Sequence, residues 1–526
     1  MEVPRTTALV DIYPEDDLNY QARRWNTLIE KFKQHYDRAP DFISRSPGRV
    51  NIIGEHIDYS LYEVFPMAVT ADVLVATAAH QKGDAVNDVH LANTDPEKFE
   101  SRTFTVSPTE DVQIDSSTLE WTNYFKAGLL GATQLLQRRQ PGIQTTVGMD
   151  VLVDGTVPSG GGLSSSAAFV CASALAVLRT NGMEHVSKKE LVELAIVSER
   201  AVGVNSGGMD QAASVFAEQG SALYVSFVPE LSAKQISFPR TESPLTFVVA
   251  QSFVTADKHV AAPVNYNLRV VEVTLAARVL ASISGLTTTS SDASPLGFSL
   301  RSFHDTYMSE KEHIADQCAV SKEQFQQQLQ DLIHKVDQYL PQEEGYDREQ
   351  LSFILRTTVD EIEERYMKTF PVRAERFKIR QRALHVFSEA VRVLRFNELL
   401  SQAPPQTEQE NSKLLTALGE LLNESHESCR ELYENSCNEL DELCSLARSA
   451  GAYGSRLTGA GWGGCTVHLV AEDKVDHLKS QLIDKYYRKK FPSMSEEQLQ
   501  DAMVVSRPGN GSAVLETHGK QKVQVR

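Results

Sequence analysis

Residues 147–178 combine a strand pattern, a loop rich in glycine and serine, and an apolar run, and this order constrains the fold more than any other feature of the chain. Residues 147–154 alternate apolar and polar side chains as a strand does. Residues 169–178 are apolar and rich in alanine, which is typical of a buried helix. A strand, a glycine-rich loop and a helix in this order favour phosphate binding, because backbone N–H groups and the helix N-terminus face the loop.

The loop has the residue types that phosphate binding requires. Glycine lets the backbone approach an anion closely, and serine hydroxyls cap a helix or donate to the ligand. The loop residues that we expect at a phosphate are Gly160, Gly161, Gly162, Leu163, Ser164, Ser165 and Ser166. The loop lacks the Gly-Lys-Ser/Thr ending of a P-loop and the third glycine of a dinucleotide loop. A glycine- and serine-rich turn that caps a buried helix remains the alternative interpretation.

Residues 45–59 hold a short apolar run, 50–53, which we expect to be a strand that ends at Gly54. Four side chains that form hydrogen bonds surround it, namely Arg49, Glu55, His56 and Asp58. Carboxylates accept hydrogen bonds from hydroxyls, and imidazole donates or accepts. The segment therefore favours a small ligand with many hydroxyls, and a charged surface turn is the alternative.

Two other segments contain clustered glycines. In residues 205–213, Asp210 follows a glycine pair in an otherwise uncharged stretch. Such a carboxylate is a candidate for a buried general base, although Asp is also a common helix N-cap. Residues 453–465 contain five glycines, and a tight turn into a strand at 465–470 is their simplest interpretation.

Length and charge limit the class of protein. A chain of 526 residues suggests two domains, and we expect an N-terminal domain of mixed α/β pattern over 1–235 and a C-terminal domain over 236–526. Past about residue 265 the pattern becomes mostly helical. The formal charge of −18 disfavours nucleic acid or an anionic membrane as the main partner. The six cysteines form no CxxC pair, so neither a zinc site nor a disulfide scaffold is indicated. With no signal-peptide pattern and no apolar run long enough for a bilayer, we expect a cytoplasmic, soluble protein.

Hydrophobic periodicity predicts the secondary structure. We expect helices over residues 20–38, 121–137, 164–180, 188–203, 265–284, 305–340, 374–400, 412–424 and 427–450. We expect strands at 64–79, 147–154, 221–228, 245–253 and 465–470.

Together these segments resemble galactokinases, which belong to the GHMP family of small-molecule kinases. Residues 47–59 are similar to the galactokinase signature, 158–168 to the GHMP phosphate loop and 454–465 to the third GHMP motif. The resemblance implies a two-domain α+β fold. Its N-terminal domain would be a ribosomal-S5-like α/β domain and its C-terminal domain ferredoxin-like with extra helices, with the active site in the cleft between them.

The resemblance also implies the reaction. ATP would phosphorylate the C1 hydroxyl of α-D-galactose in galactose catabolism (the Leloir pathway), with Asp210 as general base and Arg49 beside it. A guanidinium there favours the ionised carboxylate and offsets phosphoryl charge. The residues implied at the sugar are Arg49, Glu55, His56, Asp58, Ser206, Gly207, Asp210 and Tyr266. Those implied at ATP are the loop residues 160–166 and Trp121 near the adenine, and those implied at Mg²⁺ are Ser166 and Glu199.

Some of these assignments have competing interpretations. From the sequence alone, the alternatives are a solvated helix acid for Glu199, a core tyrosine for Tyr266 and a packing residue for Trp121. Ser206 stands where some fungal relatives have asparagine, so N-acetylgalactosamine kinase is an alternative function. A second alternative is a transcriptional inducer that responds to galactose and ATP through a regulatory protein partner. The complete serine loop at 163–168 favours catalysis over that role.

Overall fold

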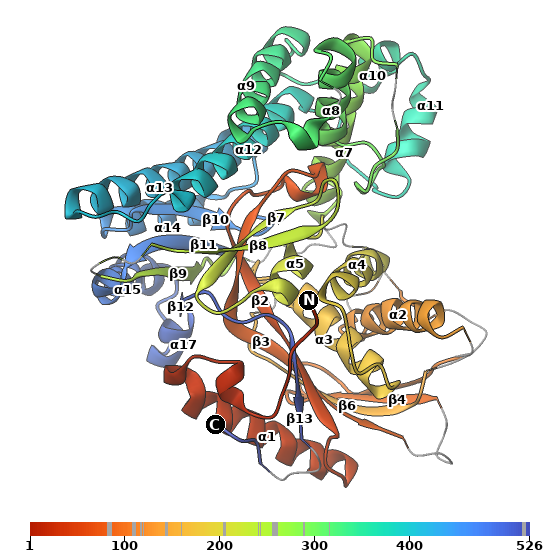
Figure 1. Cartoon of the computed structure of the whole chain (residues 1–526), viewed down its shortest axis with the longest axis vertical. Helices are drawn as coiled ribbons and strands as arrows, with labels where there is room; N and C mark the ends of the chain where they lie inside the picture. Colours follow the sequence, from red (N-terminus) through yellow and green to blue (C-terminus); the bar gives the residue numbers. More distant parts are fainter. Residues whose placement is uncertain are drawn as a thin grey trace.

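The computed structural model describes the chain except for residues 81–86, 108–111, 116, 117, 119, 142–145, 159, 204–206, 240, 242, 255–260, 288, 289, 315, 518–521 and 526. The fold combines three sheets with many helices, which confirms the α+β class (Figure 1). No helix in the described part of the chain is long and apolar enough to cross a membrane.

The largest sheet has seven strands in the order β1-β13-β2-β3-β6-β4-β5. Their bounds are Arg5–Thr6 (β1), Ala513–Glu516 (β13), Phe42–Ile53 (β2), Phe65–Ala79 (β3), Met149–Gly155 (β6), Asp88–Asn93 (β4) and Arg102–Thr105 (β5). The β1–β13 and β4–β6 pairs are parallel, and the other pairs are antiparallel. Because β13 lies beside β2, the end of the chain returns to the N-terminal sheet. The division at residue 235 stays a prediction.

Strand β2 is longer than the run at 50–53 that we expected, because it begins at Phe42. The polar residues Ser44, Arg45 and Ser46 interrupt the apolar pattern, so the sequence does not indicate the first part of the strand. All three are nevertheless buried. The Arg45 guanidinium donates to Asp72 Oδ2 at 2.6 Å, so its charge is compensated inside the protein. A polar residue with a fixed partner therefore continues the strand instead of ending it.

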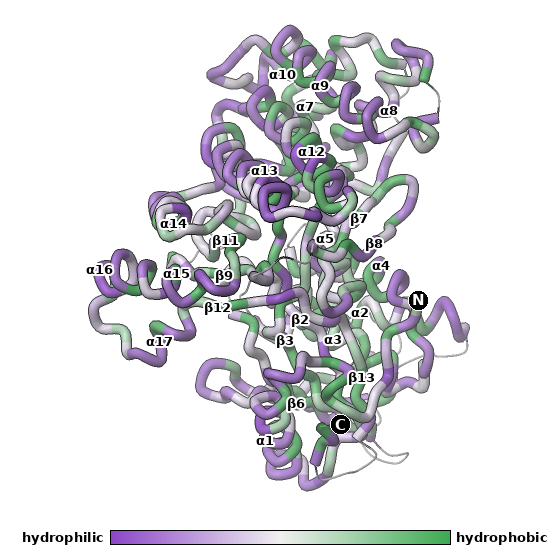
Figure 2. Tube along the Cα trace, turned by 60° about the vertical axis from the view of Figure 1, so that its left-hand side comes forward, coloured by the Kyte–Doolittle hydropathy of each residue, from purple (hydrophilic) through white to green (hydrophobic). Residues whose placement is uncertain are grey.

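Helices cover both faces of this sheet (Figure 1). Helix α1 (Leu18–Tyr36) buries Trp25, Leu28, Ile29 and Phe32 against one face, as its periodicity predicts. The other face carries α2 (Thr122–Arg139), α3 (Ser165–Thr180), α4 (Lys188–Glu199) and α5 (Met209–Phe216). Figure 2 shows a largely hydrophobic trace along α3 and the central strands, whereas α13 (Glu408–Ser428) is largely hydrophilic.

The remaining strands form two smaller sheets. One has the order β10-β11-β9-β12 and is antiparallel throughout, and the other pairs β7 with β8. Their bounds are Gly454–Thr458 (β10), Cys465–Ala471 (β11), Leu245–Gln251 (β9), Met503–Ser506 (β12), Ser221–Ser226 (β7) and Ser232–Ser237 (β8). Helices α14 (Asn438–Ser449) and α15 (Val475–Leu482) pack on the four-stranded sheet through buried aliphatic residues.

A helical region lies beyond these sheets (Figure 1). It contains α7 (Tyr266–Ile283), α8 (Leu300–Lys311), α9 (Lys322–Tyr339), α10 (Arg348–Leu355), α11 (Val359–Ile362), α12 (Ile379–Ser401) and α13. The single helix expected over 305–340 is wrong, because α8 ends at Lys311 and Ser321 starts α9 with a capping box. The helix expected over 427–450 is also interrupted, since Glu434 adopts a left-handed conformation before α14.

Candidate active site

A cavity of about 520 Å³ lies where the β2–β3 turn, the start of α3, α5, the start of α7 and the loop after β10 meet. Many of the residues predicted from the sequence line it, namely Arg49, Glu55, His56, Asp58, Gly160, Gly162, Ser164, Ser166, Glu199, Asp210 and Tyr266. Four motifs that are far apart in the chain therefore meet in one place. Among the described residues, the predicted ones outside this lining are Gly161, Leu163, Ser165, Gly207 and Trp121. Ser206 lies outside the described residues.

Asp210 is held by two side chains from different motifs. The Arg49 guanidinium contacts Oδ1 through Nε at 2.7 Å and Nη2 at 2.6 Å. The Ser164 hydroxyl donates to Oδ2. Asp210 lies in the first turn of α5 and Gly208 takes the N-cap position, so the N-cap interpretation of Asp210 is wrong. Both carboxylate oxygens thus have a fixed direction beside the cavity.

The serine loop leads directly into α3. Ser164 occupies the N-cap position in a left-handed conformation (φ 58°), but its side chain turns to Asp210 and makes no capping hydrogen bond. Leu163 is buried, and its carbonyl accepts from the Arg49 N–H at 3.0 Å. Gly162 also has a positive φ of 73°, and a Cβ there would lie 3.1 Å from the Thr458 carbonyl oxygen. The loop is therefore packed between β2 and β10, with the N-terminus of α3 at the cavity.

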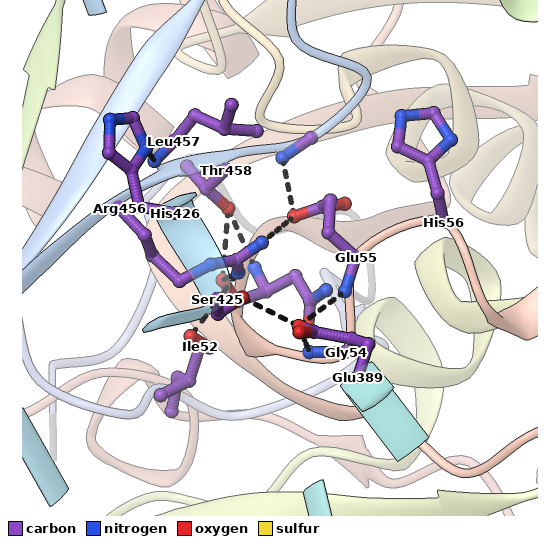
Figure 3. Close-up of polar contacts among 12 residues, drawn as sticks. Ile52, Gly54, Glu55, His56, Glu389, Ser425, His426, Arg456, Leu457 and Thr458 are labelled. Carbon is purple, nitrogen blue, oxygen red and sulfur yellow. Dashed lines mark hydrogen bonds and ion pairs between the residues drawn. The ribbon is translucent and has the colours of Figure 1, made fainter. Parts of the chain in front are cut away.

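Glu55 is buried in an ion pair that crosses from the first sheet to the second. Its Oε2 accepts from Arg456 Nη2 at 3.0 Å and from the Gly459 N–H at 3.1 Å (Figure 3). Burial raises the pKa of Glu55 to about 7, although Arg456 and Arg49 favour its ionised form. Arg456 is itself fully buried and donates to the carbonyls of Asn51 and Ile52.

Glu389, on helix α12, fixes the backbone of this turn and was not among the residues predicted from the sequence (Figure 3). Its Oε1 accepts from the N–H groups of Gly54 at 2.9 Å and Glu55 at 3.3 Å, and from the Ser425 hydroxyl at 2.6 Å. Its Oε2 accepts from Arg392 Nε at 2.7 Å. Burial alone would raise the pKa of Glu389, but Arg392 and other nearby cations lower it to about 2.

A signal for this contact exists in the sequence. Arg382, His385 and Glu389 follow one another at spacings of three and four, so they share one face of α12, and all three are buried. Charged side chains on the apolar face of a helix require partners. His385 meets this requirement with the same turn, because its Nε2 contacts the Glu55 carbonyl oxygen at 3.0 Å.

His56 forms hydrogen bonds through both ring nitrogens. Nε2 lies 2.9 Å from the Ala460 carbonyl oxygen and must donate to it, so Nδ1 accepts from the Tyr59 hydroxyl at 2.9 Å. Tyr433 in turn contacts the Tyr59 hydroxyl. Burial lowers the pKa of His56 to about 3, which keeps the ring neutral. The ring centroid of Tyr266 lies 5.6 Å from that of His56, and both side chains line the cavity.

Asp58 and Gly207 are in close contact. The Met209 N–H donates to Asp58 Oδ2 at 3.4 Å. A Cβ on Gly207 would lie 2.4 Å from Asp58 Cγ and 2.4 Å from the Tyr59 backbone nitrogen, so only glycine fits there. Burial, together with the negative charge of Asp210, raises the pKa of Asp58 to about 6.

Ser166 and Glu199 both line the cavity, and Glu199 is buried at the end of α4. Glu199 accepts a hydrogen bond from Gln211 Nε2. The interpretation of Glu199 as a solvated helix acid is therefore wrong. Trp121 stacks on Phe169 of α3 with ring centroids 6.0 Å apart, and its Nε1 donates to the Glu100 carbonyl at 3.0 Å.

Three known protein families match segments of this chain that contain residues of the site. Residues 30–79 match the family described as the galactokinase galactose-binding signature. Residues 123–218 match the GHMP kinases N terminal domain, and residues 411–489 match the GHMP kinases C terminal family.

Relatives match over nearly the whole chain. The Saccharomyces cerevisiae protein named galactokinase is 41% identical over 510 residues, which cover 94% of this chain and 95% of that protein. The galactokinase of Schizosaccharomyces pombe is 38% identical over 502 residues, with the same coverage of 94% and 95%. The fold is similar to that of Lactococcus lactis galactokinase complexed with galactose, with a TM-score of 0.62 at 23% identity, covering 93% of this chain and 99% of that one.

Proposed function

Since the chain belongs to the galactokinase family of GHMP kinases, we propose that it transfers the γ-phosphoryl group of ATP to the C1 hydroxyl of α-D-galactose, with Asp210 as the general base. Galactokinase activity is the function of the family, and the chain has the family's two-domain α+β fold. The roles of individual residues are our proposal. The observation that carries it is the contact of Asp210 with both Arg49 and Ser164.

That contact supports a general base because of where it lies. Ser164 belongs to the glycine- and serine-rich loop, and Arg49 lies in strand β2, within the galactose-binding signature. Asp210 therefore lies between the loop that we propose for the ATP phosphates and the segment that we propose for the sugar. The carboxylate accepts the C1 hydroxyl proton as the sugar oxygen attacks phosphorus. The Arg49 guanidinium is in position to offset negative charge on the phosphoryl group.

For the sugar, we propose the side chains of Glu55, Asp58 and Tyr266, with Gly207 making room for Asp58. Both ring nitrogens of His56 form hydrogen bonds within the protein, so we propose that His56 positions the aromatic side chains that line the cavity. A pocket of buried polar groups rejects an epimer because a misplaced hydroxyl leaves these groups unpaired. We therefore expect galactose to be strongly preferred over glucose.

For ATP, we propose that the loop 160–166 and the N-terminus of α3 hold the phosphates. The role of Trp121 near the adenine stays a prediction, supported by its stacking on Phe169 of α3. Mg²⁺ prefers oxygen ligands, and the Ser166 hydroxyl and the buried Glu199 carboxylate provide them in the same cavity. These residues fit the ion and would hold it together with phosphate oxygens. When bound, Mg²⁺ offsets the charge of the phosphates.

Release of ADP by the purified protein with MgATP tests the proposal, with galactose, glucose and N-acetylgalactosamine in parallel reactions. We expect turnover with galactose to exceed turnover with glucose by about 100-fold or more. Turnover with N-acetylgalactosamine would assign the chain to that sister activity. Galactose binding in the presence of ATP without any turnover would favour the inducer, and a pull-down with and without both ligands would then identify a protein partner.

A further inference from the structure

Two histidines and an aspartate gather at one end of the seven-stranded sheet, outside the cavity. His80 directly follows β3, His90 lies in β4 and Asp150 lies in β6. The register pairs Asp150 with His90 on one side and with Ala78 on the other. Because side chains alternate along a strand, the residue two positions after Ala78 returns to the same face. Three neighbouring strands thus bring their polar side chains to one face.

The three ligating atoms are close enough to share an ion. His80 Nε2 lies 3.0 Å and His90 Nδ1 2.8 Å from the same oxygen, Asp150 Oδ1, and all three atoms lie within 4.8 Å of one another. We propose that His80, His90 and Asp150 bind one divalent transition-metal ion of the Zn²⁺ type. Two imidazole nitrogens and a carboxylate oxygen are common zinc ligands, whereas Mg²⁺ prefers an all-oxygen shell.

The surroundings permit such a site. The His80 side chain is only 8% exposed, and its Nδ1 has no hydrogen-bond partner among the described residues. The ring can therefore carry its proton on Nδ1 and present a lone pair from Nε2 without breaking an existing hydrogen bond at Nδ1. His90 is 41% exposed, which leaves a path for the ion and room for a water ligand.

Two neighbours contact the cluster. The Tyr36 hydroxyl, in the last turn of α1, donates to the His90 carbonyl at 3.0 Å. Arg38 opposes a cation, but its Nε lies 3.7 Å from the other carboxylate oxygen, Asp150 Oδ2. Oδ1 therefore remains directed at the histidines. The expected consequence of binding is a link between β3, β4 and β6 that stabilises this end of the sheet.

Metal titration of the full-length protein tests the proposal. After treatment with a chelator and its removal, we expect one Zn²⁺ per chain by calorimetry, and a visible absorption band when Co²⁺ is used as the probe. Zn²⁺ above its dissociation constant should raise the melting temperature, because it binds the folded state. His90→Ala and Asp150→Asn should each weaken binding by about tenfold or more and remove most of the thermal shift.

His477→Ala provides the matched control, since His477 is an exposed histidine on α15 and should bind as wild type does. Galactose phosphorylation with MgATP should be unchanged in His90→Ala, because none of the three residues lines the cavity. That activity also reports that the variant is folded. Absence of stoichiometric Zn²⁺ and Co²⁺ binding, or binding that His90→Ala leaves intact, would overturn the proposal and leave a hydrogen-bonded His–Asp–His cluster.

Discussion

The Glu389 carboxylate on α12 accepts a 2.9 Å hydrogen bond from the backbone N–H of Gly54, although the two residues are 335 positions apart in the chain. The same oxygen accepts from the next N–H, that of Glu55. Glu389 therefore positions the turn that carries Glu55 and His56 without lining the cavity itself.

Glu389→Gln should raise the KM for galactose by about tenfold or more, because a hydrogen bond to a charged group contributes about 1.5–3 kcal/mol. The KM for ATP should change much less, since the contacts of Glu389 are on the sugar side. Glu398→Gln, an exposed position on the same helix, is the control and should behave as wild type. Equal changes in both KM values would instead indicate a general loss of stability.

Asp210→Asn should lower kcat by about 10²–10⁴-fold while galactose binding is retained, because an amide cannot accept the hydroxyl proton. Ser164→Ala should have a smaller effect on kcat, because it removes one hydrogen bond to Oδ2 and leaves the Arg49 contact with Oδ1. Steady-state kinetics and calorimetric titration with galactose measure the two effects separately. A near-normal kcat for Asp210→Asn would exclude it as the base.

The parts of the fold that the sequence predicted are those with a local signal. Helix α1 follows from the spacing of its apolar residues, and α3 follows from the apolar run after the glycine loop. The full length of β2 could not be predicted, because the buried charge of Arg45 is compensated by Asp72, a residue on another strand. The break between α8 and α9 depends on the capping box at Ser321, which hydrophobic periodicity alone does not detect.

In the candidate site too, the sequence predicts the residues that lie in local motifs, whereas those that act through distant contacts could not be predicted. Arg49, Ser164 and Asp210 lie in short motifs, so the sequence identified each of them, and the fold brings them together. Glu389 lies outside the predicted motifs, and Arg456 lies in the segment 454–465 but was not predicted as a site residue. Both support the turn after β2 through contacts across hundreds of positions. Such contacts follow from how α12 and β10 pack on the turn after β2, which local patterns do not encode.

Gly207→Ala should weaken galactose binding more than ATP binding. The new Cβ would overlap Asp58 Cγ and the Tyr59 backbone nitrogen at 2.4 Å, so the sugar turn must move. Gly155→Ala is the matched control, because its Cβ would meet only Val73 at 3.8 Å. Galactose affinity from calorimetry and the melting temperature of each variant test this. An unchanged galactose affinity in Gly207→Ala would contradict the proposal that the close packing of Gly207 against Asp58 positions the sugar-binding turn.

Acid should destabilise the protein through its buried histidines. Burial lowers the pKa of His56, His304 and His468 to about 3 and that of His385 to about 4, from an ordinary value of 6.5. Between these values the unfolded chain binds protons that the folded protein does not, so the free energy of unfolding falls as the pH falls below 6.5. Glu55 and Asp58 act in the opposite direction, because their raised pKa values make the folded state bind protons first. Asp17, Glu63 and Asp305, whose pKa values burial also raises, act in the same direction as these two acids. The destabilising contribution of the histidines is therefore measured one histidine at a time.

His468 offers the sharpest test of this pH dependence, because it is fully buried in β11 and lies outside the residues that line the cavity. His468→Asn removes its titration, so the free energy of unfolding from urea curves should fall less steeply with acid than in wild type, by about one proton or 1.4 kcal/mol per pH unit. His477→Asn, at an exposed position, should leave the slope unchanged. If both variants kept the wild-type slope, buried His468 would not contribute to acid sensitivity.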